Sequence, residues 1–327
     1  MSAALKLEPA APLVKLRNLT VRFVSRDADV AAVNGVDLDL AAGESLCILG
    51  ESGSGKSVTL RALMKLLPKK AVVEGGIEVA GNNVQAMSES QLQDFRGSTV
   101  AMIFQEPMTA LDPVFTIGTQ IAETVCRHEG ISRSAGMARA LELLELVQIP
   151  SAKRRLAAYP HELSGGLRQR AMIAVALACR PKLLLADEPT TALDATVQIQ
   201  VLLLLRELQE KLGMGVIFVT HDLGVAGEIA DRVAVMYAGR VVEEGPVRAV
   251  MKRPLHPYPQ GLLGATVHAG LRGQRLTTIP GAPPSLENLP PGCAFAPRCS
   301  LAEPACTVAV PEARKVGADR MARCIKV

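Results

Sequence analysis

The stretch Gly50-Glu-Ser-Gly-Ser-Gly-Lys-Ser57 decides the fold class of this chain. It follows the apolar run Ser45 to Leu49 and precedes a stretch with helical spacing from Lys56 to Leu67, so the expected order is strand, loop and helix. The glycines let the backbone curl tightly enough for successive N–H groups to point at phosphate oxygens, and the amino terminus of the helix assists them. The sequence therefore predicts a phosphate-binding loop.

The loop residues have separate expected parts in binding ATP. Lys56 is placed to reach the β and γ phosphates, and Ser57 to offer its hydroxyl to Mg²⁺. A flexible surface loop is the alternative for such a pattern, but the flanking strand and helix argue against it. The residues predicted to hold the nucleotide here are Gly50, Glu51, Ser52, Gly53, Ser54, Gly55, Lys56 and Ser57.

The composition favours an α/β interior. The chain has 327 residues, of which 49% are hydrophobic and 3% aromatic, so Leu, Val, Ala and Ile must build most of the core. The net charge of +4 comes from 36 basic and 32 acidic residues spread along the chain. Because no block of like charge resembles a nucleic-acid-binding arm, we expect no nucleic-acid partner.

We expect neither export nor a membrane-spanning segment. The first residues, MSAALKLEPAAPLVKL, lack a basic leader followed by an apolar core of signal-peptide length. The longest apolar runs, such as Ala171 to Cys179 and Val201 to Leu205, are far shorter than the ~20 residues that a spanning helix needs. A disulfide framework is not expected from the cysteines of such a chain.

Strand-like patterns occur in two parts of the chain. Val14 to Val24 and Val36 to Leu40 alternate apolar and polar residues, which is typical of edge strands in a partly antiparallel sheet. Apolar runs return at Lys182 to Ala186, Gly215 to Thr220 and Arg232 to Tyr237. Helical stretches separate these later runs, which indicates parallel strands joined by crossovers.

These patterns predict an α/β nucleotide-binding core with an antiparallel β subdomain and two additions. Helical spacing with no long strand candidate predicts a helical insertion at about 106–165. Beyond residue 250, many prolines and glycines interrupt any long regular element. We therefore expect an N-terminal tail at 1–13, a nucleotide-binding domain at 14–250 and an irregular C-terminal extension at 251–327.

A second motif, Leu183-Leu-Leu-Ala-Asp-Glu188, is an apolar strand that ends in two carboxylates. Asp187 is expected to hold the water shell of Mg²⁺, and Glu188 to orient or deprotonate the attacking water. Adjacent acids before a proline, here Pro189, more often start a helix, so this motif alone is weak. The phosphate loop earlier in the chain makes the catalytic interpretation the stronger one.

A third motif, Leu163-Ser-Gly-Gly-Leu-Arg-Gln-Arg170, resembles the signature sequence of ABC-type ATPases. In that family the signature serine and glycines, here Ser164, Gly165 and Gly166, cap the γ-phosphate held by the phosphate loop of a partner domain. A hydroxyl and exposed N–H groups at a helix start are suited to such an anion site. A simple helix cap explains the local sequence but not its co-occurrence with the other motifs. Leu167 departs from the commoner Gln of the signature.

The resemblance covers about residues 14 to 250 and implies two further residues at the γ-phosphate. Gln105 resembles the loop glutamine that senses Mg²⁺ and the γ-phosphate at the junction with the helical insertion. His221, in Val219-Thr-His-Asp222, resembles the switch histidine that contacts the γ-phosphate. Either residue alone is more often a surface or core side chain, and their order along the chain favours the catalytic roles.

Two more positions match the family one at a time. Asp194 resembles the residue of a loop that crosses the dimer interface, although Asp also forms ordinary turns. Phe23 lies where the family stacks an aromatic ring on adenine, although an aromatic residue at a strand end is more often part of the core.

The extension resembles that of oligopeptide and dipeptide importer ATPases. The resemblance implies peptide uptake first, with nickel, glutathione or sugar import as alternatives because those systems share the extension. The segments that carry it are His256-Pro-Tyr258, Gly261-Leu-Leu263, Ile279-Pro-Gly-Ala-Pro-Pro284 and Gly292-Cys-Ala-Phe-Ala-Pro-Arg-Cys299.

Four cysteines crowd the end of the chain: Cys293, Cys299, Cys306 and Cys324. Four thiolates are enough for a tetrahedral zinc site or a 4Fe-4S cluster. The paired C-x-x-C spacing that is typical of zinc is lacking, and related peptide-importer subunits are associated with an iron–sulfur cluster at matching cysteines. We therefore expect a cluster with a structural role, with zinc or unligated, partly oxidised cysteines as alternatives.

One signature copy implies that the chain closes on a second ABC-type ATPase subunit, which the resemblance favours as related rather than identical. It also implies two transmembrane permease subunits, an external substrate-binding protein and a peripheral position at the cytoplasmic face of the inner membrane. A soluble ABC-type ATPase of translation or DNA repair is an alternative, but such proteins usually carry two nucleotide domains or a long coiled coil. A kinase or nucleotide switch is a further alternative, but the signature sequence argues against it.

Overall fold

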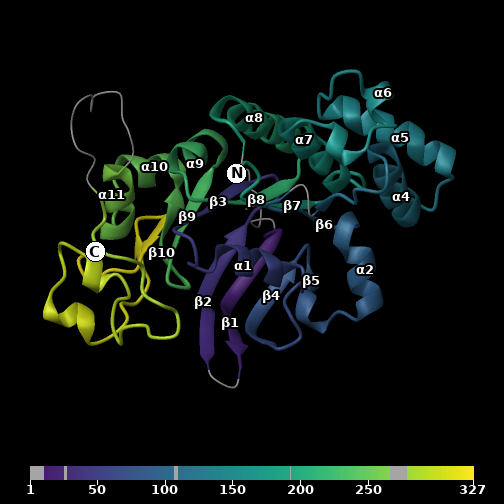
Figure 1. Ribbon diagram of the computed structural model, residues 1–327. Coiled ribbons are helices and arrows are strands. Elements are labelled where there is room, and N and C mark those ends of the chain that lie inside the picture. The colour runs from purple at the N-terminus through teal and green to yellow at the C-terminus, as the bar shows by residue number, and fades with distance from the viewer. Residues whose placement is uncertain (1–10, 26–27, 107–109, 192, 266–277) are drawn as a thin grey trace, which may run out of the picture.

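A computed structural model of the protein describes residues 11–25, 28–106, 110–191, 193–265 and 278–327 (Figure 1). In these ranges an eight-stranded sheet runs in the order β11-β12-β10-β9-β3-β8-β7-β6, and its strands from β9 to β6 are parallel. Its strands are β3 (Ser45–Leu49), β6 (Val100–Ile103), β7 (Leu183–Asp187), β8 (Gly215–Thr220), β9 (Arg232–Tyr237), β10 (Arg240–Pro246), β11 (Arg314–Val316) and β12 (Arg320–Ala322).

Alternate residues of each central strand enter two different cores, because side chains along a strand point to opposite faces. In β3, Cys47 and Leu49 face one core, whereas Leu46 and Ile48 face the other. Both faces are covered, so the strand reads as an unbroken apolar run. The helices that pack around these cores are α1 (Lys56–Leu63), α7 (Gly165–Ala176), α8 (Ala195–Leu212), α9 (Leu223–Ile229) and α10 (Val247–Lys252).

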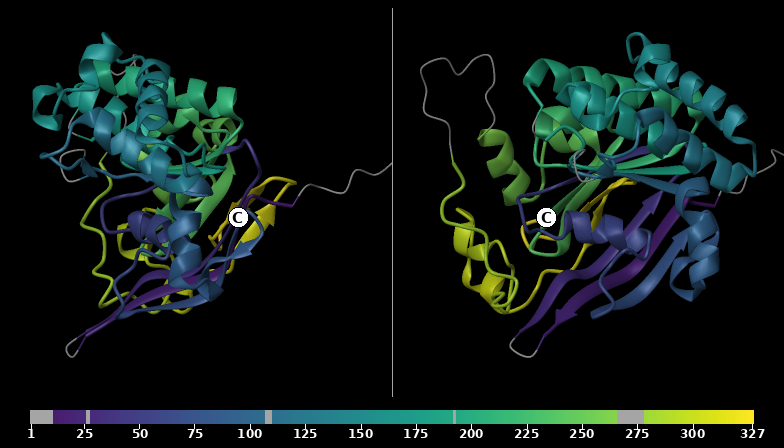
Figure 2. Two further views of the ribbon diagram at one scale, coloured as in Figure 1. Left: turned by 90° about the vertical axis from the view of Figure 1, so that its right-hand side faces the viewer. Right: turned by 45° about the vertical axis from the view of Figure 1, so that its right-hand side comes forward.

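A second, antiparallel sheet packs against α1, which lies between the two sheets (Figure 2). Its order is β2-β1-β4-β5, so the antiparallel subdomain predicted from the alternating pattern is present. Helix α1 ends earlier than predicted, since Lys65 adopts a left-handed φ of 51° that stops the helix. The strands are β1 (Val14–Val24), β2 (Asp29–Leu40), β4 (Ala71–Val79) and β5 (Asn82–Asn83).

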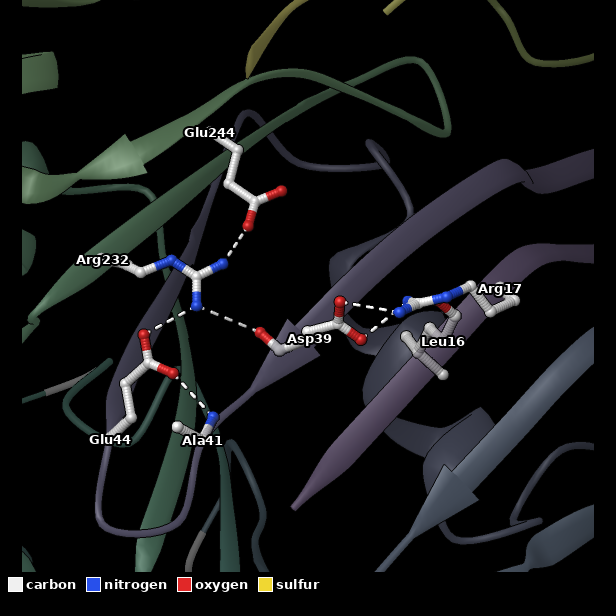
Figure 3. A network of polar contacts seen from close by, with 7 residues as sticks. All are labelled: Leu16, Arg17, Asp39, Ala41, Glu44, Arg232 and Glu244. Atoms are coloured by element: carbon white, nitrogen blue, oxygen red, sulfur yellow. Dashed lines mark hydrogen bonds and ion pairs between the residues drawn. The ribbon is translucent and has the colours of Figure 1, made fainter. Parts of the chain in front are cut away.

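Arg232, at the start of β9, joins the two sheets (Figure 3). Its guanidinium donates to Glu44 at 2.7 Å and to the backbone carbonyl of Asp39 at 3.2 Å, and it also pairs with Glu244. The Asp39 carboxylate in turn accepts from Arg17 on β1 at 2.8 Å. Burial raises the pKa of Glu244, and the adjacent Arg232 opposes that shift. This network fixes the small sheet against β9 and β10.

Further helices and the extension lie at opposite ends of the central sheet (Figures 1 and 2). One end carries the predicted helical insertion, and the other carries the C-terminal extension. The helices η1 (Val84–Ala86) and α2 (Glu89–Ser98) come before the insertion. The insertion contains the helices α4 (Ile117–Glu129), α5 (Arg133–Leu146), α6 (Ala152–Arg155) and η2 (Pro160–Glu162). Those of the extension are α11 (Pro257–Gly264), η3 (Ala296–Arg298) and η4 (Pro304–Thr307).

The extension is more closely joined to the core than its irregular sequence indicates. Strand β12 pairs with β10, with Ala322 opposite Glu243, and so extends the central sheet. Strands β11 and β12 have 3 residues each, too few to show an alternating pattern in the sequence. Their pairing depends instead on neighbours that are distant in the chain.

A buried carboxylate on β10 holds the extension in place. Glu243 is 0% exposed and accepts N–H groups from Leu255 at 2.9 Å and His256 at 2.7 Å. It also accepts from the Arg320 guanidinium at 2.6 Å. Burying a carboxylate without hydrogen-bond donors is costly, so these three donors are what stabilise Glu243 at this position.

We therefore expect Glu243→Ala to lower the free energy of unfolding by about 3–5 kcal/mol, because it leaves the Arg320 guanidinium without its carboxylate partner in a mostly buried site. Chemical denaturation followed by circular dichroism measures this change. The matched control is Glu142→Ala, whose carboxylate is 62% exposed and bonded to Arg139 at 2.7 Å. Glu142→Ala is expected to lower the free energy of unfolding by under about 1 kcal/mol. Equal losses of this free energy in the two variants would contradict the role given to Glu243.

Candidate functional site

The phosphate loop connects β3 to α1, as predicted, and it requires glycine at particular positions. Gly53 and Gly55 have φ values of 78° and 100°, which side-chain-bearing residues rarely adopt. A Cβ at Gly50 would lie 2.3 Å from the carbonyl oxygen of Met236, and one at Gly55 would lie 2.3 Å from that of Ala32. Close backbone approach from two other strands therefore shapes the loop.

Lys56 is buried under the loop, with 4% of its surface exposed. Its Nζ donates to the carbonyl oxygens of Gly50 and Glu51, each at 2.8 Å. Burial lowers the pKa of Lys56, while the nearby carboxylates of Glu188 and Asp187 oppose that shift. These contacts hold the ammonium group among the backbone amides that would surround a phosphate chain.

Ser57 and Asp187, the two residues predicted to serve Mg²⁺, lie in direct contact. The Ser57 hydroxyl donates to Asp187 Oδ1 at 2.7 Å, although the two residues come from α1 and the end of β7. Asp187 is 2% exposed. Burial raises its pKa, and the hydrogen bond from Ser57 opposes the change. A hydroxyl and a carboxylate side by side are oxygen ligands of the kind that Mg²⁺ takes, so the residues present fit this ion.

Glu188 is the point at which the other predicted catalytic side chains meet. Its Oε2 accepts from Gln105 Nε2 at 3.4 Å and lies 3.7 Å from His221 Nδ1. It also accepts from the Thr191 hydroxyl at 2.9 Å. The φ of Glu188 is 45°, a left-handed conformation that costs a non-glycine residue about 1–3 kcal/mol. Strain at the end of β7 thus accompanies this arrangement.

Thr191 is a contact that sequence reasoning missed. The hydroxyl lies three positions after Glu188 and orients its carboxylate, and the signal available was its place in the turn that follows Asp187 and Glu188. A residue that bonds the proposed base from the same turn limits the directions in which the carboxylate points. We therefore add Thr191 to the site as a positioning residue.

A cavity of about 790 Å³ lies over the phosphate loop. Gln105, Glu188 and His221 line it together with the loop itself, and Leu286 from the extension also lines it. This volume is within the ~300–1,000 Å³ that is usual for small-molecule sites. The cavity therefore has room for a nucleotide with its phosphates over Lys56 and Ser57.

Phe23 and Asp194 lie outside this group. Phe23, on β1 opposite Val30 and Ala71, is half-buried and packs against the core of the small sheet. Phe23 is not among the described residues that line the cavity, so its contact with adenine stays a prediction. Asp194 caps α8 by accepting the N–H of Val197 at 3.0 Å, which is the turn-forming role named as its alternative.

The signature residues begin α7 and likewise do not appear among the described residues lining the cavity. Ser164 is exposed, and its side chain makes no capping hydrogen bond in the described part of the chain. A Cβ at Gly166 would lie 2.6 Å from Val197 Cγ1. Gly166 is therefore needed for packing α7 against α8, whatever else it does.

The four C-terminal cysteines surround one small cavity of about 20 Å³: Cys293, Cys299, Cys306 and Cys324. The Cys299 sulfur accepts the N–H of Leu301 at 3.4 Å, and the Cys293 N–H donates to the Cys306 carbonyl at 2.7 Å. Burial raises the pKa of Cys293 and of Cys299, and the neighbouring thiols add to both shifts. All four are free cysteines. Within the described ranges, however, no three His, Cys, Asp or Glu residues form a group that could hold a metal ion.

Comparison with known proteins identifies the family. Residues 33–191 match the family model for ABC transporters, and residues 242–306 match the model for the C-terminal region of oligopeptide/dipeptide transporters. The chain is 47% identical over 320 residues to the oligopeptide transport ATP-binding protein OppD of Salmonella typhimurium, covering 98% of this chain and 95% of that protein. This chain belongs to the ABC transporter ATP-binding proteins of the oligopeptide and dipeptide type.

Other members and solved structures agree with this family. OppD of Bacillus subtilis is 50% identical over 293 residues, which cover 89% of this chain and 82% of that protein. The ATP-binding cassette MJ0796, solved as a dimer in a post-hydrolysis state bound to ADP and Pi, is 31% identical with a TM-score of 0.64, covering 72% of this chain and 99% of that one. The fold, the family and the ATPase of a peptide importer that the motifs predicted are thereby confirmed.

Proposed function

We propose that this peptide-importer ATPase binds Mg·ATP in the cavity over the phosphate loop and hydrolyses it with Glu188 as the base. The observation that carries this proposal is the meeting of Gln105, Thr191 and His221 around the Glu188 carboxylate. The contact between Ser57 and Asp187 lies in the same site. Bases and metal ligands thus gather at the carboxyl ends of parallel strands, where α/β proteins bind ligands.

The chain's own residues divide the work of phosphoryl transfer. The loop N–H groups and Lys56 hold the phosphates, and Ser57 with Asp187 would hold Mg²⁺, which when bound neutralises charge on the phosphate oxygens. Glu188 accepts the proton of the attacking water, and Thr191 keeps its carboxylate oriented. Gln105 and His221 are proposed to contact the γ-phosphate.

We also propose that Ser164, Gly165, Gly166 and Asp194 complete the site of a second ATPase subunit. Two observations support this: none of the four is among the described residues lining the cavity, and the similar cassette MJ0796 forms a dimer. The exposed Ser164 hydroxyl and the start of α7 offer donors to a phosphate that approaches from outside. ATP would then hold two subunits together, and hydrolysis would release them.

Gly166 allows a test that separates this role from packing. In Gly166→Ala the new methyl meets Val197, so we expect a lower melting temperature and lower ATPase activity in the assembled complex. In Gly166→Ala/Val197→Ala the clash is removed and the melting temperature recovers, while activity stays low because the proposed phosphate contact needs a backbone N–H without a side chain at this position. Val197→Ala alone is the control. Recovery of activity in the double variant would leave Gly166 with a packing role only.

The proposed partners are a related ATPase subunit, two permease subunits and an external substrate-binding protein. OppD relatives carry oligopeptide transport in their names, and the C-terminal match is to the same class of transporter. No helix in the described ranges combines the length and hydrophobicity needed to cross a bilayer. We propose a peripheral position at the cytoplasmic face of the membrane, held by these partners. We also propose a division near residue 250 between the nucleotide-binding domain and the extension.

Purification of the tagged chain from its native cells tests this assembly. We expect two multispanning proteins and a second, related ATPase to be recovered with it, and ATPase activity of the complex to rise with a di- or oligopeptide and its binding protein. Recovery with ribosomes or DNA repair proteins would refute the importer. A response only to nickel or glutathione would move the substrate class to the alternatives.

We further propose that the four cysteines bind a 4Fe-4S cluster. They surround one cavity, and four cysteine thiolates are the usual ligands of such a cluster. The N–H of Leu301 that points at the Cys299 sulfur is a typical neighbour of such thiolates. Anaerobic purification should yield protein with iron and acid-labile sulfide, both reduced in Cys299→Ser. Zinc alone, or no metal, would refute the cluster.

A further inference from the structure

We infer that the C-terminal extension positions the phosphate loop through Arg298, and that this contact sets the affinity of the loop for ATP. The proposal concerns a side chain outside the nucleotide motifs, 247 positions from the loop residue that it binds. It rests on four observations: a bidentate ion pair, a tyrosine on the loop backbone, an aromatic cluster and the charge of the loop.

Arg298 makes a two-pronged ion pair with the loop residue Glu51. Its Nη1 donates to Glu51 Oε2 at 2.7 Å, and its Nη2 donates to Glu51 Oε1 at 3.1 Å. The same guanidinium donates to the Tyr237 hydroxyl at 3.2 Å and to the Pro280 carbonyl at 2.9 Å. Arg298 is 7% exposed. Such planar, paired contacts fix both the position and the orientation of a carboxylate.

The extension also holds the backbone of the same loop residue. The N–H of Glu51 donates to the Tyr258 hydroxyl at 2.9 Å, and Tyr258 is 0% exposed. The Tyr258 ring packs on Tyr237 and Phe295 with centroid distances of 4.7 and 5.4 Å. In a chain with only 3 Tyr and 6 Phe, this cluster joins α11, β9 and the cysteine segment behind the loop. Both ends of Glu51 are thus fixed from the extension.

The charge of Glu51 explains why the contact matters for ATP. Glu51 lines the cavity over the phosphate loop, so its carboxylate lies beside the site proposed for the anionic phosphates. Two negative charges in a partly buried site repel each other more strongly than they do in water. Arg298 balances this carboxylate, and without Arg298 the loop would present an uncompensated negative charge to the nucleotide.

The place of Arg298 in the chain joins this contact to the cysteine cavity. It ends the short helix η3, immediately before Cys299, and its backbone N–H donates to the Phe295 carbonyl at 2.9 Å. A change in the fold of the segment from Cys293 to Cys299 therefore moves the guanidinium. Because coupling between two sites is reciprocal, nucleotide bound at the loop should also stabilise this segment.

The first measurement is the dissociation constant of Mg·ATP by calorimetry, with the full chain carrying Glu188→Gln to prevent hydrolysis. Arg298→Met is expected to weaken binding about tenfold or more, within the range of ordinary coupling between sites. Arg314→Met is the matched control, because Arg314 lies in the same extension, is exposed, and its side chain bonds only the Val327 carbonyl among the described contacts. Its dissociation constant is expected to stay within about twofold of the parent.

Two further variants separate electrostatic positioning from simple damage to the extension. Glu51→Gln/Arg298→Met removes the unbalanced carboxylate and is expected to recover most of the lost affinity, which a misfolded extension would not allow. Arg298→Lys keeps the charge but loses the two-pronged geometry, and it should fall between the parent and Arg298→Met. If Arg298→Met does not fold, Arg298→Lys carries the test: a higher dissociation constant for Mg·ATP than in the parent supports the inference, and an equal one refutes it.

Hydrogen exchange over residues 293–300 gives a readout that does not depend on activity. Adding Mg·ATP to the parent should slow exchange in this segment, and Arg298→Met should abolish that response. An unchanged dissociation constant in folded Arg298→Met, or an equal loss in Arg314→Met, would refute the inference alone. A parent chain that binds no Mg·ATP would refute the proposed nucleotide site together with it.

Discussion

Glu188→Gln is expected to lower the rate of ATP hydrolysis in the assembled transporter at least about 100-fold, while Mg·ATP still binds with near wild-type affinity. Glutamine has the same shape and keeps an oxygen that can accept from Thr191, so the turn after β7 is preserved. It cannot take a proton from water at neutral pH. The loss should therefore appear in the turnover rate and not in the binding of nucleotide.

Single-turnover hydrolysis and equilibrium binding, measured on the same preparation, check this expectation. The control is Glu210→Gln, on the exposed side of α8 with its carboxylate 61% exposed, which should hydrolyse ATP at the wild-type rate. Turnover in Glu188→Gln within a few fold of the wild type would exclude Glu188 as the base. The cavity would then offer His221, which lies 3.7 Å from Glu188, as the next candidate.

Asp187→Asn is the second change with a large expected effect. It should lower Mg²⁺-dependent hydrolysis at least about 100-fold, because an amide oxygen carries no charge to hold the ion that neutralises the phosphates. The hydrogen bond from Ser57 can persist, since the Asn oxygen still accepts it. Hydrolysis measured over a range of Mg²⁺ concentrations should show both a lower maximum and a weaker dependence on the ion.

The same substitution should not lower the melting temperature of the protein without Mg·ATP. Burial raises the pKa of Asp187, so its charged form is less favourable in the folded than in the unfolded chain. This contribution to stability is present below the ordinary Asp value of about 3.9 and is lost as the pH rises through the raised pKa. At pH 7 the neutral Asn avoids the cost of a buried charge. Mg·ATP should then raise the melting temperature of the wild type but not of the variant.

Asp319→Asn, at an exposed position between β11 and β12, is the matched control for both measurements. It should leave hydrolysis and the melting temperature unchanged. A melting temperature of Asp187→Asn well below the wild type would mean that the carboxylate serves the fold as well as the ion. Full Mg²⁺-dependent activity in that variant would exclude Asp187 as the residue that holds the ion.

The sequence alone determined the parts of this protein that contiguous residues encode. A glycine-rich loop that ends in Lys-Ser between an apolar strand and a helix is typical of phosphate binding, so the loop from Gly50 to Ser57 could be recognised without a structure. Strands β8 (Gly215–Thr220) and β9 (Arg232–Tyr237) have the predicted bounds, because both faces of a parallel sheet demand apolar residues. The family signature on α7 narrowed a general nucleotide binder to an ABC-type ATPase.

Only the tertiary structure decided which distant residues meet. Gln105 and His221 meet at Glu188 because parallel strands place their carboxyl ends together. The pairing of β12 with β10 and the bond between Arg298 and Glu51 cross most of the chain. Such contacts depend on packing and charge between segments that no local pattern connects. The phosphate loop could therefore be predicted from the sequence, but its contact with the extension could not.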